Sequence, residues 1–463
     1  MITPQAMEGL DARDIDCSLQ IVSRPEDAIK PTDTSVFIAT DPLWSPNYGT
    51  YDRDTLTIKY RKLATILMNL GVDGADVEQE LEQSLDYINH SYDLFEGKKD
   101  AGYDASFAFL VPTRLNSKDT KYSGEIYPYL PILQRVDPLT RQRTFQGMCP
   151  AVLDTYIQDE QGRKGVMVFT PVFEDMPNDI NNLTTTLHIT RKIVNDTVDF
   201  AHNKLGASIV GLGATLPKYT KLGRTIKVPG ANITTGHGGT VWLIGETVNK
   251  AQESVKGGGS EYIGMIGLGA IGASSAEYIL DDPNRRVILF DRATSTAQKV
   301  YMQLAERYGS GRVLMANNIG EVLVKSNIIV SAVTSPIGMD LDPQLADIDL
   351  TGKIIIDDSQ PGCFNKGEIE ARGGLLAWVI GEDMSLSNIL TKEHGFSYGG
   401  WGPVSDRREI WGCEAEAGSI SHMEAYDLAT TTAISPEVAR RIGRICEQSG
   451  VRVAKLQSFG QYL

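Results

Sequence analysis

Residues 262–280 read YIGMIGLGAIGASSAEYIL, and this stretch is the strongest indicator of the fold. An apolar, strand-like run leads into a GxGxxG pattern that opens a helix, and a second apolar run ends at Asp291, roughly 20 residues after the last glycine. In such a pattern the glycines permit a tight turn, a close approach of a pyrophosphate to the backbone, and close packing of helix on strand. The stretch therefore predicts a dinucleotide-binding unit whose cofactor contacts are Gly267, Gly269, Ala270, Ile271 and Gly272.

The end of the second strand bears on the choice of cofactor. Asp291 can accept hydrogen bonds from a ribose 2′-hydroxyl and would repel a 2′-phosphate, which favours NAD. Arg292 follows it and could pair with that phosphate, which favours NADP. From these two residues the choice stays open.

Beyond this unit, apolar runs continue to alternate with helical ones. The runs 328–333, 354–356 and 375–380 read as buried strands, and this alternation is typical of a doubly wound parallel sheet. Small and polar residues close the first of these strands. Ligands bind at the carboxyl ends of such strands, so Thr334 and Ser335 are expected near the nicotinamide, with a plain turn as the alternative.

The whole chain is expected to be an α/β protein of four regions. Upstream, helical periodicity gives way to strand-like runs that include a hairpin turned near residues 160–162, and a Gly-rich linker at 256–260 precedes the glycine pattern. The expected regions are a helical N-terminal extension (1–105), an α/β substrate domain (106–255), a Rossmann dinucleotide-binding domain (256–400) and a C-terminal helical segment (401–463).

Composition restricts the classes of function. The chain has 463 residues and a formal net charge of −15, which argues against nucleic acid as a partner because binding it requires a basic surface. No apolar run approaches the roughly 20 residues of a membrane helix, and the first residues do not resemble a secretory signal, so a cytoplasmic protein is expected. The five cysteines form no CxxC pair, so neither a disulfide framework nor a structural metal site is expected.

One cysteine is a candidate nucleophile. Cys413 lies in WGCEAEAG, residues 411–418, which reads as the start of a helix. The helix dipole and the upstream arginines would stabilise a thiolate there, whereas Glu414 and Glu416 would oppose it. From the residues alone, Cys413 is either a nucleophile or a small buried apolar residue.

The chain from about residue 106 to its end resembles the long-chain acyl-acyl carrier protein reductases of cyanobacteria, which form fatty aldehydes. The similar stretches, in order, are VLDTYIQDEQGRKGVMVFTPVFEDMP, ITRKIVNDTVDFAHNKLGASIVGLGA, ITTGHGGTVWLI, GLGAIG, IIIDDSQPG and WGCEAEA. An aromatic-Gly-Cys-x-Ala-Glu-Ala segment supplies the nucleophile of that family, so the resemblance implies this role for Cys413. It implies NADPH as the cofactor, although Asp291 leaves NADH possible, and it does not cover residues 1–105.

The resemblance also implies a reaction: acyl transfer from an acyl carrier protein or coenzyme A to Cys413, then hydride transfer that releases an aldehyde. The oxyanions formed on this route need hydrogen-bond donors. The turn formed by residues 234–237 offers them, with Thr235 and His237 as the catalytic candidates, and His237 could also protonate the departing group. Alternatively, this turn only caps the helix that follows it.

A basic segment follows the third strand-like run of the first half. Four basic residues and no acid lie within ten positions, which is unusual in so acidic a chain. The segment is either a solvated loop or a docking site for an acidic acyl carrier. Its basic residues are Lys218, Lys221, Arg224 and Lys227.

Two further functions remain open. A dehydrogenase of a small hydroxy or amino acid would use the same dinucleotide-binding unit and would need no thiol. A non-catalytic dinucleotide sensor or scaffold would use residues 1–105 to bind a partner. Acyl chain length and oligomeric state leave no sign in the sequence.

Overall fold

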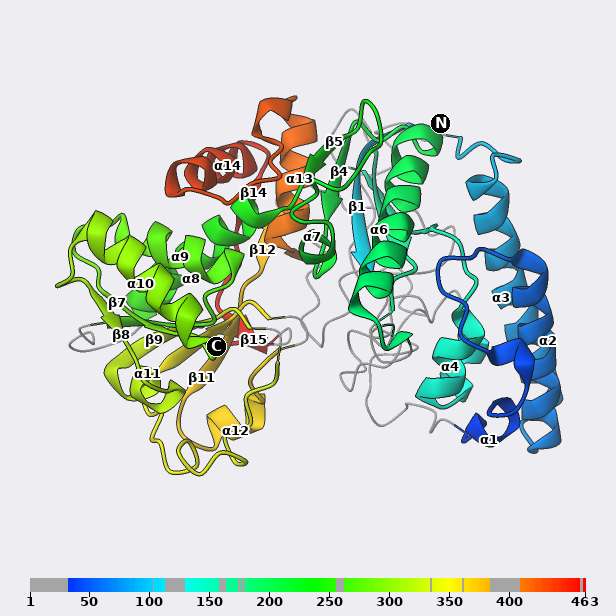
Figure 1. The fold of residues 1–463 in the computed structure, drawn as a ribbon, viewed down its shortest axis with the longest axis horizontal. Helices are drawn as coiled ribbons and strands as arrows, with labels where there is room; N and C mark the ends of the chain where they lie inside the picture. Colours follow the sequence, from blue (N-terminus) through cyan, green and yellow to red (C-terminus); the bar gives the residue numbers. More distant parts are fainter. Residues whose placement is uncertain are drawn as a thin grey trace, which may run out of the picture.

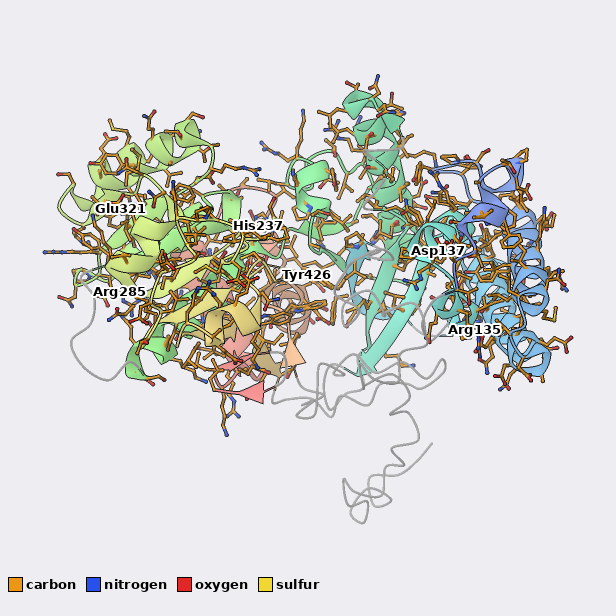
Figure 2. All side chains as sticks on the ribbon, turned by 90° about the horizontal axis from the view of Figure 1, so that it is seen from below. Arg135, Asp137, His237, Arg285, Glu321 and Tyr426 are labelled. Carbon is orange, nitrogen blue, oxygen red and sulfur yellow. The ribbon has the colours of Figure 1, made fainter. Side chains whose placement is uncertain are left out.

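The chain folds into an α/β structure with two main sheets, one in each half of the molecule (Figure 1). In a computed structural model, the described residues are 32–102, 104–112, 130–157, 164–173, 176, 180–254, 262–333, 335–359, 362–383, 409–458 and 461–463. Viewed from below, Arg135 and Asp137 lie toward one end of the molecule, Arg285 and Glu321 toward the other, and His237 between them (Figure 2). None of the helices within these ranges has the length and apolar character needed to cross a membrane.

The second half contains the doubly wound sheet that the sequence predicts. Its six strands are all parallel, in the order β11-β10-β9-β6-β7-β8. The order reverses between β6 and β9, and ligands of such sheets bind outside the carboxyl ends of the strands at this point. The strands are β6 (Tyr262–Ile266), β7 (Val287–Phe290), β8 (Val313–Met315), β9 (Ser326–Ser331), β10 (Ile354–Asp357) and β11 (Leu375–Trp378), and the helices are α9 (Ala270–Leu280), α10 (Thr294–Tyr308), α11 (Ile319–Lys325) and α12 (Lys366–Glu370).

The first half contains a five-stranded sheet in the order β2-β3-β1-β4-β5. Only β2 and β3 pair antiparallel, as expected for the predicted hairpin, whose turn lies outside the described residues. Its strands are β1 (Ala105–Pro112), β2 (Ala151–Ile157), β3 (Lys164–Thr170), β4 (Ile209–Leu212) and β5 (Asn232–Thr234), and the helices between them are α6 (Leu183–Asp199), continued by a π-helical turn at Phe200–Lys204, and α7 (Leu216–Tyr219).

The helices of the N-terminal region pack against this sheet. Asp52 and Asp73 accept hydrogen bonds from the first amides of α2 and α3, which fixes where both helices begin. The Tyr87 hydroxyl on α3 donates to the backbone carbonyl of Val152 on β2 (2.9 Å). The elements are α1 (Ser35–Ile38), η4 (Pro42–Trp44), α2 (Arg53–Asn69), α3 (Gly74–Phe95), η5 (Pro131–Arg135) and α4 (Pro138–Phe145).

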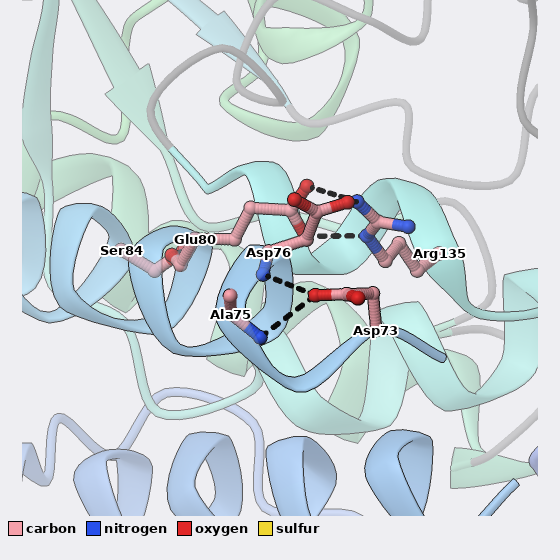
Figure 3. A network of polar contacts seen from close by, with 6 residues as sticks. All are labelled: Asp73, Ala75, Asp76, Glu80, Ser84 and Arg135. Atoms are coloured by element: carbon pink, nitrogen blue, oxygen red, sulfur yellow. Dashed lines mark hydrogen bonds and ion pairs between the residues drawn. The ribbon is translucent and has the colours of Figure 1, made fainter. Parts of the chain in front are cut away.

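An ion-pair network fastens the start of α3 to η5 (Figure 3). The Arg135 guanidinium donates to both carboxylate oxygens of Glu80, at 2.6 and 2.7 Å, and reaches Asp76 at 3.4 Å. The apolar faces of α2 and α3 belong to the same core as the five-stranded sheet. The helical character expected for this region is confirmed from residue 53 to 95, while the division into domains stays a prediction.

Three helices connect the two halves. Helix α8 (His237–Ser254) leads from β5 toward the dinucleotide-type sheet. In Figure 1, α13 (Gly412–His422) lies at the top between the halves, and α14 (Pro436–Gln448) lies beside it above α8 and α9. Helix α13 packs on β1 and β4, so the chain returns from the second half to the first. The remaining elements are β12 (Gly381–Asp383), β13 (Glu409–Ile410), β14 (Val451–Val453), η7 (Tyr426–Leu428), β15 (Gln457–Ser458) and β16 (Gln461–Tyr462).

Candidate functional site

The glycine loop between β6 and α9 has the geometry of a pyrophosphate site. Gly267 has a φ of +87°, and a Cβ there would lie 2.5 Å from the carbonyl oxygen of Ala332. A Cβ on Gly272 would lie 1.9 Å from the Gly267 carbonyl oxygen, so helix and turn need glycine here. Gly269 is the N-cap of α9, is exposed, and no side chain caps the helix. The first amides of α9 are therefore available to an anion.

Asp291 lies directly beside this loop. Its carboxylate accepts hydrogen bonds from the Leu268 amide (2.7 Å), inside the glycine pattern, and from the Ala293 amide (2.8 Å). Arg292 is exposed. The structure thus brings the carboxylate to the edge of the loop, where the ribose of a bound dinucleotide would lie.

The segment after β9 also passes this loop. Ala332 contacts Gly267, and the Val333 amide donates to the hydroxyl of Ser359 (3.3 Å). Ser335 is exposed three residues further on, whereas Thr334 lies outside the described residues. The expected position of Ser335 near a nicotinamide stays a prediction.

Cys413 lies in the first turn of α13. Trp411 is the N-cap and provides no side-chain cap, and the Glu414 amide hydrogen-bonds to the sulfur. Among the cysteines that the structure describes, Cys413 is partly exposed and the other three are buried. Cys413 differs in this respect from the other three cysteines, while its role as a nucleophile stays a prediction.

The electrostatic surroundings of Cys413 oppose a resting thiolate. Part of the residue is exposed, yet protein atoms surround the sulfur, and this burial raises its pKa well above the usual range. The charges of Glu414, Asp358 and Glu416 raise the pKa further, while the Glu414 amide lowers it. Cys413 is therefore a neutral thiol at pH 7 in the ligand-free protein.

The turn before α8 touches Cys413. Gly236 has a φ of +70°, and a Cβ there would lie 2.3 Å from the Cβ of Cys413. His237 is buried, and burial lowers its pKa to about 4, so its imidazole is neutral at pH 7. The Thr235 hydroxyl accepts from the His237 amide (3.4 Å), and the Thr235 amide donates to the Thr430 carbonyl (3.2 Å). Thr235 and His237 therefore flank the glycine that touches Cys413, and their catalytic roles stay predictions.

Two donors of this turn are already used by Glu416, a residue to which the sequence assigned no binding role. The Thr234 hydroxyl donates to Glu416 Oε1, and the Gly239 amide donates to Glu416 Oε2 at 2.7 Å. The amides of Gly236 and Gly238 also lower the pKa of Glu416 through hydrogen bonds. An oxyanion at Cys413 could not use the Thr234 hydroxyl or the Gly239 amide, because Glu416 occupies these donors.

A second site residue without a predicted role is Asp358, which follows β10. Asp357 accepts the amides of Ser359 (3.0 Å) and Cys363 (2.7 Å) and so holds the turn. Burial and the charge of Asp357 raise the pKa of Asp358, and Asp358 is near enough to raise the pKa of Cys413. The thiol thus lies between the carboxyl edges of both sheets, at the end of β5 and at the end of β10.

The basic segment leaves the same edge of the five-stranded sheet. It follows β4, whose last residues pair with β5 beside the turn that touches Cys413. All four of its basic side chains are exposed, as expected for either a solvated loop or a docking surface: Lys218, Lys221, Arg224 and Lys227.

Comparisons with known proteins add little beyond the fold. No family model matches the chain, and no curated protein is similar to it in sequence. Similar solved structures include an imine reductase from Bacillus cereus (17% identity, TM-score 0.20), of which the chain matches 40% with 26% of its own length. They also include quinate dehydrogenase from Corynebacterium glutamicum in complex with NAD (15%, TM-score 0.32) and shikimate dehydrogenase from Aquifex aeolicus (13%, TM-score 0.32).

The extent of these matches differs. The chain spans about two fifths of the length of the imine reductases, whereas 74% and 75% of it match 99% of the quinate and shikimate dehydrogenases. Likeness at such low TM-scores carries no conclusion about substrate or activity.

Proposed function

We propose that the chain is a nicotinamide-dependent oxidoreductase that reduces an acyl thioester to an aldehyde through a thioacyl intermediate on Cys413. The observation that carries the proposal is the position of this thiol between the carboxyl edges of the two sheets, against the Gly236 turn and near Asp358. A nucleophile there could hold an acyl group within reach of a cofactor on the dinucleotide-type sheet.

The residues around the glycine loop fit a dinucleotide. The open N-terminus of α9 at Gly269 would hold the pyrophosphate, and Asp291 would accept from the adenosine ribose. A bound reduced nicotinamide supplies a hydride. Because Asp291 would repel a 2′-phosphate, NADH fits this edge better than the NADPH that the family resemblance implies.

The first step exchanges one thiol for another. The sulfur of Cys413 attacks the thioester carbonyl, the bond to the carrier thiol breaks, and the proton of Cys413 passes to the departing sulfur. His237 follows the glycine that touches Cys413, and its neutral imidazole is the proposed relay for this proton. The products are a thioacyl enzyme and a free carrier thiol.

The second step reduces the thioacyl group. One hydride and one proton convert it to an aldehyde and regenerate the Cys413 thiol. The side chains of Thr235 and His237 are the proposed donors for the oxyanion, since the Thr234 hydroxyl and the Gly239 amide serve Glu416. The substrate is an acyl group on acyl carrier protein or coenzyme A, and the exposed basic segment is the proposed docking surface for an acidic carrier.

A second function is favoured by the electrostatics of the same site. Burial and three carboxylates keep Cys413 protonated, which suits a dehydrogenase of a small hydroxy or amino acid that needs no thiolate. The quinate and shikimate dehydrogenases reported above belong to the dehydrogenases by name, but their likeness to this chain is too weak to decide. The third alternative, a sensor or scaffold, would leave α2 and α3 free for a partner, whereas both bury their apolar faces in the core.

Intact-mass analysis separates these functions. The protein is incubated with octanoyl-pantetheine without nicotinamide, and the acyl mass is expected on the wild type and absent from the Cys413→Ala variant. Adding NADH or NADPH should discharge the adduct as octanal. A wild-type protein that shows no adduct but oxidises a hydroxy or amino acid with NAD or NADP would establish the second function instead.

A further inference from the structure

Glu416 is a carboxylate enclosed at the centre of the molecule. It lies on α13 one turn after Cys413 and is fully buried. Its hydrogen-bond partners in the described part of the chain are the Thr234 hydroxyl and amides at the start of α8, of which Gly239 lies at 2.7 Å. Within the described ranges no cationic side chain bonds to it, so these neutral donors carry the stabilisation of its charge when it is ionised.

These donors belong to one structural unit, the turn that enters α8. The turn leaves β5 at Thr234, and Gly236 passes against Cys413. At Gly239 a Cβ would lie 2.1 Å from the carbonyl oxygen of Gly412, so the two helices meet backbone to backbone. Glu416 therefore ties the N-terminus of one helix to the first turn of the other, at the point where the thiol lies.

The described groups that stabilise the charge of this carboxylate are amides and a hydroxyl. Among the described residues, the titratable groups that interact with it are Cys413 on its own helix and Cys446 on α14. Glu414 and Asp358 act on the first of these thiols, Asp383 and Glu447 act on the second, and His237 lies in the turn that Glu416 holds. Burial raises the pKa of both thiols and lowers that of His237, so these three are neutral at pH 7. Burial raises the pKa of Glu416 to about 7, although the hydrogen-bond donors around the carboxylate act to lower this pKa.

A neutral side chain could fill the space that Glu416 occupies at a lower cost in free energy. A buried charge costs free energy that a neutral side chain of the same shape, such as glutamine, avoids. Glutamine, however, has one acceptor oxygen. If that oxygen faces the Gly239 amide, the Thr234 hydroxyl has to accept from the glutamine NH2 group instead of donating. Only a carboxylate accepts from Thr234 on one oxygen and from Gly239 on the other.

We propose that Glu416 is a positioning residue of the Cys413 site, whose carboxylate clamps the Thr234–Gly239 turn onto the first turn of α13. The proposal that this clamp serves acyl transfer rests on the proposed function. The clamp itself rests only on the contacts of Glu416. When ionised, Glu416 holds the turn so that Thr235 and His237 keep their places beside the thiol, and protonation weakens the hold because one oxygen loses acceptor strength.

The test compares three variants of the full-length protein. Glu416→Gln and Thr234→Val each remove part of the clamp with little change in volume. Ser419→Ala is the matched control, because Ser419 is buried on the same helix and its hydroxyl bonds to Cys446 rather than to the turn. Amide hydrogen exchange is measured over residues 236–240, and the acylation rate of Cys413 by octanoyl-pantetheine is measured in single turnovers.

The clamp predicts a specific set of results. Exchange of these amides should be at least tenfold faster in Glu416→Gln and Thr234→Val than in the wild type and in Ser419→Ala. The saturating acylation rate should fall at least tenfold in the same two variants, with the half-saturating concentration within twofold. In the wild type, protection corrected for intrinsic exchange should decline as the pH falls through about 7, and this decline should disappear in Glu416→Gln.

Other results overturn the inference. If amide exchange in both variants equals that in Ser419→Ala, no clamp exists. If a variant does not fold, the wild-type pH profile decides the same point, because the clamp requires protection to decline as the pH falls through about 7. Faster exchange with unchanged acylation shows that the clamp does not position the site. Faster exchange in a protein whose wild type is never acylated refutes the proposed function and the positioning role, and leaves Glu416 a structural clamp.

Discussion

The turns that begin α8 and α9 have similar backbone conformations, but they differ in what accepts hydrogen bonds from the first amides of the helix. Each follows a strand at the carboxyl edge of a sheet and contains a glycine with positive φ, +70° at Gly236 and +87° at Gly267. At α8 the chain's own Glu416 accepts from the helix amides. At α9 the N-cap is the exposed Gly269, which provides no side-chain cap, and Asp291 accepts from the Leu268 amide ahead of the helix rather than from the helix amides in the described part of the chain.

This difference shows that a glycine turn before a helix does not by itself indicate a ligand site. A helix N-terminus attracts negative charge, and that charge can come from a ligand or from the protein itself. At α9 the charge is left for a ligand, whereas at α8 it is built in, and the turn serves to hold Cys413. Substitutions at the two turns should therefore have separable effects.

The largest effect is expected from Gly236→Ala. The new Cβ would lie 2.3 Å from that of Cys413, so turn and thiol must move apart. Because a displacement of about 1 Å can cost 100-fold in rate, acylation of Cys413 should fall by ~100-fold or more in single-turnover measurements. The control is Gly352→Ala, where φ is +73° and no atom lies within 4 Å of the new Cβ. Equal loss in both variants would assign the effect to backbone strain.

At α9 the informative change is Gly269→Asp. A Cβ there meets nothing within 4 Å, so the fold should tolerate the side chain, while its charge would occupy the anion site. The affinity for NADH or NADPH, measured by calorimetry, should weaken by roughly 30- to 100-fold, or about 2–3 kcal/mol. Gly311→Asp, equally unobstructed, is the control. Acylation without cofactor should persist in both, and unchanged cofactor affinity in Gly269→Asp would remove α9 from the binding site.

A smaller effect is expected from Asp291→Asn. The asparagine oxygen can still accept from the Leu268 amide, but the charge that would repel a 2′-phosphate is gone. The ratio of kcat/KM for NADPH over NADH should rise on the order of 5- to 100-fold, as for a change of 1–3 kcal/mol. An unchanged ratio would show that Asp291 serves only to hold the glycine loop.

The smallest effect is expected in the basic segment. Lys218→Glu with Lys227→Glu should raise the KM for a carrier-bound thioester about threefold to tenfold, because surface charges act on encounter. Lys221 is left unchanged, since its φ of +52° makes substitution there a separate strain. Turnover of octanoyl-pantetheine should stay constant, and Lys299→Glu on α10 is the control. Equal loss on both substrates would place the segment in the catalytic site.

The features that the sequence predicted well depend on local patterns. Helix α9 begins and ends within the stretch 262–280 as the pattern predicts, and strand β7 ends directly before Asp291, because glycines and apolar runs mark these boundaries. Strand β9 was expected at 328–333 but runs from Ser326 to Ser331, where it pairs with β6 and β10. Its carboxyl end still lies beside the glycine loop, as the strand-to-helix pattern requires.

The contacts that complete the site could not be predicted in this way. Glu416 bonds to Thr234 across 182 residues and to Gly239 across 177, and such pairs leave no spacing in the sequence. Asp358 lies within a stretch that carries the family resemblance, yet only the fold brings it near Cys413. The sequence identified the thiol and the turn beside it, and folding supplied the carboxylates that surround them.

The bond from Tyr87 to Val152 has a consequence for any shortened form of this protein. Strand β2 is an outer strand of its sheet, and outer strands expose backbone groups that can pair with another molecule. Helix α3 covers β2, and the Tyr87 hydroxyl occupies one of its carbonyls. A chain starting at residue 104 would therefore expose the edge strand β2 with unpaired backbone groups. Such a chain should self-associate through this strand, even with every residue of the proposed catalytic centre in place.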